Sequence, residues 1–196
     1  YPFPFLVEGA AAVWGLEMDE SRLAAAQEDL GRLARANLLE VEGWFEDGTP
    51  AAYRFQPALR QAVARRVADE ERPGHLAGYA AYGAWLARRG YVDIHRNVAL
   101  NRLVRLSLDA LDAATGSLAG TEQLWHVRWL AWLKAAYGET GAAYELLEGA
   151  VAPAPDPEQD PEGARVQSAL RYEQARLCVT RGDLDRALAL LEESLQ

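Results

Sequence analysis

Two segments of the chain repeat each other at a distance of 44 residues, and this repeat constrains the fold more than any other feature. Residues 131–151 read AWLKAAYGETGAAYELLEGAV, and residues 175–195 read ARLCVTRGDLDRALALLEESL. The matching positions are Ala131 with Ala175, Gly138 with Gly182, Ala143 with Ala187, and Leu146-Leu147-Glu148 with Leu190-Leu191-Glu192. Small residues let two antiparallel helices approach closely, and a glycine ends the first helix. The repeat therefore predicts helical hairpins that stack on one another.

Composition and charge narrow the classes of protein that fit this chain. Half of the residues are hydrophobic and a quarter are charged, which is typical of a folded globular chain. The net charge of −9 argues against a nucleic-acid partner held by electrostatics. No apolar run approaches the roughly 18 residues of a membrane span, so we expect no membrane partner. The single cysteine, Cys178, cannot form an internal disulfide, which favours a cytoplasmic location. The chain begins at Tyr1 within an apolar run, and we interpret it as a piece of a longer protein.

The first 72 residues show a change of hydrophobic period from helical to extended and back. Asp47-Gly48 is a strong signal for a hairpin turn, and Pro57 suits the start of a helix. The predicted elements are a helix over 6–14, a helix from a cap at Asp19 or Ser21 to about Ala36, strands in 38–45 and 51–55, and a helix from Pro57. This order is typical of the second half of a winged helix. We therefore predict a winged-helix domain over residues 1–72, with residues 38–55 as its wing.

Residues 73–196 carry only helical signals. The predicted helices lie near 75–89, 92–113, 122–137, 140–150, 164–181 and 183–195, with breaks at Gly90, Thr115-Gly116-Ser117, Gly138 and Gly182. Residues 152–163 hold four prolines and four acidic residues, and we expect a stiff, solvated linker there. This linker explains why the period exceeds the 34 residues of a tetratricopeptide repeat. The fold class is thus mainly α: a winged helix with a β-hairpin wing, followed by tetratricopeptide-like α-helical hairpin repeats over 73–196.

Three motifs in the first half resemble a known family. Tyr53-Arg54-Phe55 stands at the end of the predicted wing, an arginine-rich helix follows over Arg60 to Arg66, and His75 to Tyr79 reads His-x-x-x-Tyr. This order resembles the region after the nucleotide-binding domain in bacterial STAND (AP-ATPase-like) signalling NTPases, which include transcriptional activators and defence sensors. The resemblance implies a winged helix that packs against an upstream NTPase domain in the parent protein, and tetratricopeptide-like sensor repeats after it.

No residue pattern in the chain supports catalysis or a bound cofactor. The phosphate-binding pattern G-x-x-x-x-G-K-[ST] is absent, and the only lysine, Lys134, has no such loop around it. The three histidines are scattered without a second ligand at metal-binding spacing, and Cys178 has no paired base. We therefore expect no enzymatic activity, no cofactor and no metal.

A stripe of aromatic residues and arginines provides the candidate binding site. Trp125, Trp129 and Trp132 recur at helical spacing, which core packing alone explains. In the register of the repeat, however, five positions fall on the concave face, where aromatics beside arginine are typical of binding hot spots. The candidate partner-binding residues are Trp125, Arg128, Trp132, Tyr172 and Arg176.

Three functions follow from this pattern. The first is a non-catalytic regulatory or sensor fragment of a STAND-type NTPase, which binds a protein or small-molecule ligand on its repeats and relays the event through the winged helix. The second is a DNA-binding transcriptional regulator module. It is disfavoured because the helix over 20–36 carries three acidic residues against three arginines, and four more acids lie in the wing. The third is a freestanding tetratricopeptide scaffold for protein–protein interaction.

Overall fold

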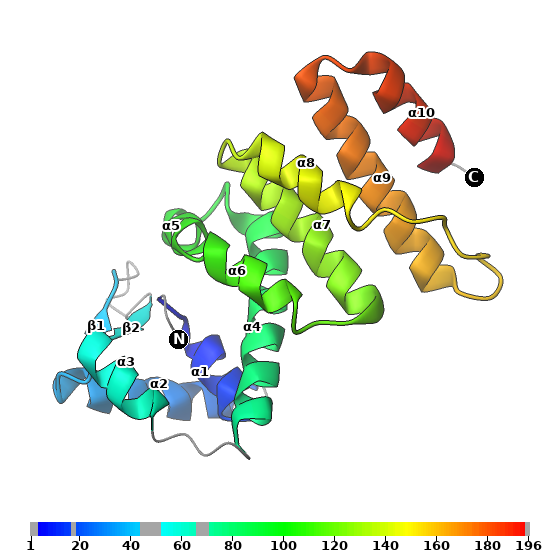
Figure 1. Cartoon of the computed structure of the whole chain (residues 1–196). Helices are drawn as coiled ribbons and strands as arrows, with labels where there is room; N and C mark the ends of the chain where they lie inside the picture. The colour runs from blue at the N-terminus through cyan, green and yellow to red at the C-terminus, as the bar shows by residue number, and fades with distance from the viewer. Residues whose placement is uncertain (1–3, 17–18, 44–51, 66–70, 195–196) are drawn as a thin grey trace. The chain divides into compact units, whose positions relative to one another are not determined.

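The chain is mainly helical, as the sequence predicts, with one small antiparallel sheet (Figure 1). The computed structural model describes residues 4–16, 19–43, 52–65 and 71–194. Contacts divide the chain into two compact units, Tyr1–Ser117 and Leu118–Gln196, and each is described by itself. The first unit contains α1 (Val7–Val13), α2 (Glu20–Arg35), β1 (Leu39–Val41), β2 (Tyr53–Phe55), α3 (Pro57–Ala64), α4 (Arg72–Asp93), α5 (Val98–Leu106) and α6 (Leu108–Thr115). The second contains α7 (Gly120–Ala136), α8 (Thr140–Glu148), α9 (Pro161–Arg181) and α10 (Leu184–Ser194).

The division after Ser117 differs from the expected boundary between residues 72 and 73. Helix α4 begins at that expected boundary, but it packs on α1, α5 and α6, so these helices share the first unit.

Among the described helices, none is both long and apolar enough to cross a membrane.

Helices α1 and α2 lie where the sequence places them. The carboxylate of Asp19 caps α2 by accepting a hydrogen bond from the backbone N–H of Arg22 at 3.0 Å. This bond, with a second from the Ser21 hydroxyl, holds the pKa of Asp19 below its usual value, because both stabilise the charged carboxylate. Of the two expected caps, Asp19 is therefore the one that acts. Ala26 and Leu30 form the buried stripe of α2, while Leu23 and Leu33 are half-buried.

The two strands of the expected hairpin pair with each other. Strands β1 and β2 pair antiparallel, with Leu39 opposite Phe55 and Val41 opposite Tyr53. Phe5 adds a bridge to the free edge of β2, since its N–H and C=O both bond to the backbone of Tyr53 at 2.8 Å. The hydroxyl of buried Tyr53 accepts a hydrogen bond from Gln27 of α2 at 2.9 Å, which ties the sheet to that helix. The expected turn at Asp47-Gly48 lies outside the described residues.

The prediction of a helix break at Gly90 is wrong. Helix α4 runs from Arg72 through Gly90 to Asp93, because its buried stripe of Tyr82, Leu86 and Gly90 continues without interruption. A glycine inside a helix costs only about 1 kcal/mol, which burial along the helix offsets.

The expected helix over 92–113 is also wrong, because two helices take its place. Asn97 caps α5 by accepting a hydrogen bond from the N–H of Leu100 at 2.9 Å. Ser107, fully buried, then separates α5 from α6 and donates its hydroxyl to the carbonyl of Leu103 at 2.8 Å. This local bond competes with the helical pattern and allows the turn.

Glycine in α4 lets α1 and α6 approach it closely. A Cβ on Gly78 would lie 2.5 Å from the carbonyl oxygen of Ala12 in α1, and one on Gly83 would lie 2.8 Å from the Cβ of Ala114 in α6. Next to these contacts, the buried hydroxyl of Tyr82 accepts a hydrogen bond from the N–H of Leu6 at 3.0 Å. Burial raises the pKa of Tyr82 above its ordinary value. The core of the first unit therefore requires small residues on α4.

We expect Gly78→Ala to destabilise the first unit by about 1–3 kcal/mol, because the new methyl group meets backbone that cannot rotate away. Gly31→Ala is the matched control. Gly31 lies inside α2, where a Cβ meets only the end of the Arg35 side chain at 3.5 Å. Helix propensity should make that variant more stable by about 0.5–1 kcal/mol. Urea denaturation followed by circular dichroism measures both changes, and equal effects would contradict the close approach of α1 and α4.

The second unit consists of two helical hairpins. Their 44-residue sequence repeat is matched by the same backbone hydrogen bond at the end of each first helix. Gly138 and Gly182 end α7 and α9 at positive φ, +91° and +81°. After each glycine, the next N–H reaches back to a carbonyl five residues earlier, from Glu139 to Lys134 at 2.8 Å and from Asp183 to Cys178 at 2.9 Å. Only a left-handed residue allows this helix end, which explains the glycine at both places.

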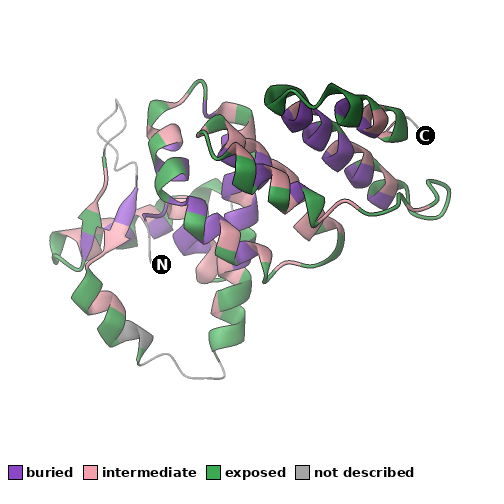
Figure 2. Cartoon of the chain, turned by 45° about the horizontal axis from the view of Figure 1, so that its top comes forward, coloured by how far each residue is buried: buried purple, intermediate pink, exposed green. Residues whose placement is uncertain are grey.

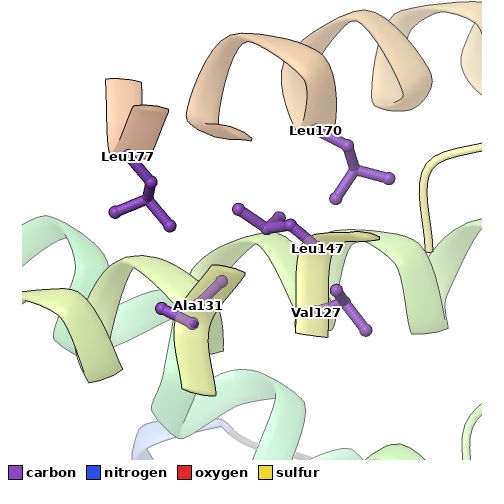
Figure 3. Close-up of a cluster of buried hydrophobic side chains, with 6 residues drawn as sticks. Val127, Ala131, Leu147, Leu170 and Leu177 are labelled. Carbon is purple, nitrogen blue, oxygen red and sulfur yellow. The ribbon is translucent and has the colours of Figure 1, made fainter. Parts of the chain in front are cut away.

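In each hairpin of the second unit, the two alanines of the repeat belong to one buried cluster. Ala131 and Ala143 share one cluster with Leu147 and with Leu170 and Leu177 of α9 (Figure 3). The second cluster, between α9 and α10, contains Ala175, Cys178, Ala187 and Leu190. Helix α9 therefore contributes to both clusters, and buried residues recur along its length (Figure 2).

The proline-rich segment is attached to the hairpins at both ends. Helix α9 already begins at Pro161, capped by the carboxylate of Asp160, so the non-helical linker is shorter than the expected 152–163. At its other end, Gln167 of α9 accepts from the N–H of Ala152 at 3.0 Å, and Arg171 donates to the carbonyl of Ala152. The residues between these attachments are mostly exposed, in agreement with a solvated linker.

Candidate partner-binding surface

The five candidate residues lie on the two first helices of the hairpins. Trp125, Arg128 and Trp132 belong to α7, while Tyr172 and Arg176 belong to α9. Both Trp125 and Trp132 are half-buried, so neither is a fully enclosed core residue. Tyr172 is 53% exposed. This burial leaves the surface interpretation open, whereas complete burial of both tryptophans would have excluded it.

A buried carboxylate that the sequence reasoning missed joins the two arginines. Glu173 of α9 is only 3% exposed in its side chain, and it lies 3.3 Å from Arg128 Nη2 and 2.9 Å from Arg176 Nε. The side chain of Arg128 is itself 17% exposed. The sequence indicates one of these two ion pairs. Glu173 precedes Arg176 by three residues, a spacing at which helical side chains form ion pairs.

Trp125 connects α7 to the first turn of α9. Its indole N–H donates to Glu162 Oε1 at 2.7 Å, and its ring stacks on Trp129 with 6.0 Å between centroids. The guanidinium groups of Arg128 and Arg165 lie 5.4 and 5.8 Å from the centroid of the Trp125 ring, within cation–π range. Trp125 is thus positioned by four neighbours, which accounts for its partial burial.

The structure brings together three of the five candidates. The guanidinium of Arg128 lies over the ring of Trp125, and Glu173 joins Arg128 to Arg176. Tyr172 lies on α9 one helical turn before Arg176, and it is exposed. Trp132 lies one helical turn after Arg128 and is half-buried.

Arginines gather at this surface, although the chain carries a net charge of −9. Two arginines, Arg128 and Arg176, meet the single carboxylate of Glu173, and Arg165 lies 3.8 Å from Glu162. These paired arginines lie beside the half-buried rings of Trp125 and Trp129. Such an arrangement suits a ligand that combines a carboxylate with an apolar or aromatic group.

The buried titratable groups of the second unit are arranged for packing. Cys178 is buried in the second cluster, and desolvation raises the pKa of its thiol, which keeps it in the unreactive protonated form. Lys134 is buried beside Glu139, with its Nζ 3.3 Å from Oε2. Among the described residues, no group of three or more histidine, cysteine or acidic side chains could hold a metal ion.

Comparison of the chain with protein-family models, with curated proteins and with solved structures gave no match.

Proposed function

We propose that this chain is a non-catalytic regulatory fragment of a STAND-type signalling NTPase, which binds a partner on its helical hairpins and relays that event through a winged helix. The observation that carries the proposal is the network of Trp125, Arg128 and Arg176, with exposed Tyr172 one helical turn before Arg176 on α9. Its arginines are held by buried Glu173, while the phenol ring of Tyr172 stays exposed. Arginines fixed in place lose little conformational entropy on binding, which favours recognition.

The first unit supports the relay half of this proposal. Helices α1 and α2, the hairpin of β1 and β2, and α3 follow one another in the order of a winged helix, and Phe5 adds a third pairing to the sheet. The unit would carry a signal as a shift of population between a state packed on the NTPase and a released state.

The charges on α2 weigh against the alternative of a DNA-reading winged helix. Arg32 lies 2.6 Å from Glu28 and 3.1 Å from Asp29, and Arg22 lies 3.2 Å from Asp19. These arginines are paired within their own helix, so α2 presents no basic stripe to a phosphate backbone. We expect no more than weak, non-specific duplex binding at physiological salt. Sequence-selective, sub-micromolar binding in a mobility-shift assay would favour the DNA-binding alternative.

Selection from a displayed library of random 12-residue peptides tests the binding surface. Peptides enriched on the wild-type chain should combine an acidic residue with an aromatic or aliphatic one. Their affinity should fall at least about tenfold on Tyr172→Ala and on Arg176→Ala, which corresponds to 1.4 kcal/mol or more. Leu76→Ala is the control, because Leu76 is similarly exposed, 52%, but lies on α4. Peptides whose affinity is unchanged by the two surface variants would contradict the assignment of this surface.

A further inference from the structure

The first hairpin has an apolar face that α9 covers. Leu147 of α8 is fully buried in the cluster that contains Leu170 and Leu177 of α9, and Ala135 and Tyr144 pack on the same cluster. Tyr144 also packs on the cluster around Cys178 of α9. These three residues, Ala135, Tyr144 and Leu147, are therefore the part of the first hairpin that receives the next helix of the stack.

The same three positions in the second hairpin are apolar, and two of them are exposed. Forty-four residues on, Ala135, Tyr144 and Leu147 correspond to Val179, Leu188 and Leu191. Val179 is 53% exposed and Leu188 is 59% exposed, while Leu191 is half-buried where Leu147 is fully buried. In the second unit α10 packs on α9, at the end of the stack (Figure 1).

We propose that Val179, Leu188 and Leu191, here called the end face, are a docking surface for one further helical hairpin. This added hairpin would repeat the contact that α9 makes with the first hairpin. Its first helix presents leucines spaced as Leu170 and Leu177 are on α9, and its second helix returns alongside the first.

Two observations favour this occupant over a single apolar side chain or a lipid. The end face continues an interface already present between the first hairpin and α9, at the same register and with the same residue class at all three positions. Stacked repeats also gain stability from each neighbour, so an uncovered end face is the place where the next contact would stabilise most. The proposal does not depend on the function proposed above, because it uses none of the five partner-binding residues.

The test uses a second copy of the α9–α10 hairpin as the added hairpin. An in-register duplication of residues 151–194, inserted after Ser194, adds a second copy of the linker and of the α9–α10 hairpin. Hydrogen exchange of the α10 amides is then compared between the original and the extended chains. Docking should slow exchange in α10 at least about tenfold, since a buried end opens less often than an exposed one.

Leu188→Glu, introduced at the original position only, provides the matched variant in both chains. It should abolish the slowing caused by the duplication, whereas Leu76→Glu, at a similarly exposed leucine of α4, should leave it intact. Unchanged exchange of α10 in the extended chain, including the case in which the added hairpin stays unfolded, would overturn the proposal. So would a dimer of the original chain in sedimentation equilibrium that Leu188→Glu dissociates, because a second copy would then occupy the end face.

Discussion

Leu147→Ala should destabilise the second unit by about 3–5 kcal/mol, because it removes a fully buried side chain at the contact between the first hairpin and α9. The repeat offers a matched control at the same position of the second hairpin. Leu191→Ala truncates the same side chain to the same product, but Leu191 is only half-buried. Its cost should be less than half as large, since part of that side chain already contacts water.

Urea denaturation of the two variants, followed by circular dichroism at 222 nm, measures this difference directly. Equal losses of stability would mean that Leu191 is as enclosed as Leu147. That result would contradict both the burial of the first cluster and the uncovered state of the end face.

Glu173→Gln should lower the free energy of unfolding by about 3 kcal/mol, although it keeps the size and shape of the side chain. The neutral amide leaves the guanidinium of Arg128, 17% exposed, without its carboxylate in a site that water reaches poorly. Arg176→Gln is the control, because Arg176 is 39% exposed and its ion pair with Glu173 is screened by solvent. That variant should cost about 1 kcal/mol or less.

A double variant separates two effects: the loss of the ion pair between Arg128 and Glu173, and the cost of leaving the charge of Arg128 without that carboxylate. Arg128→Met in the Glu173→Gln background should recover a large part of the stability, since it removes the uncompensated charge and restores apolar packing. Additive losses in the double variant would show that Arg128 and Glu173 do not interact, and would remove the network from the candidate surface.

The parts of the fold that follow a local rule could be predicted from the sequence. The spacing of Ala131, Gly138 and Ala143 predicted the helical hairpins. The alanines allow two helices to approach closely, the glycine ends the first helix, and the same three residues recur 44 positions later. The hairpin of β1 and β2 followed from its extended period. The break at Gly90 was wrong because glycine permits a helix end without requiring one, and the buried stripe of α4 decided the outcome.

The candidate surface could be predicted only in part, for a different physical reason. Helical spacing placed Trp125 and Arg128 on one face, but it could not show that Glu173, on another helix, would lie between two arginines. Contacts between helices depend on tertiary packing, which the period of a single helix does not encode. The division after Ser117 was missed for the same reason, because it depends on how α4 packs on α1 and α6.

The position of α9 has a consequence for how the second unit loses its structure. Stacked hairpins can fray one at a time from an open end when each has a cluster of its own. Here Leu170 and Leu177 of α9 belong to the cluster of the first hairpin, while Ala175 and Cys178 of the same helix belong to that of the second. Neither cluster can form without α9, so loss of this one helix removes both. Helices α7, α8 and α9 should therefore melt in a single cooperative transition, while α10 can open before them.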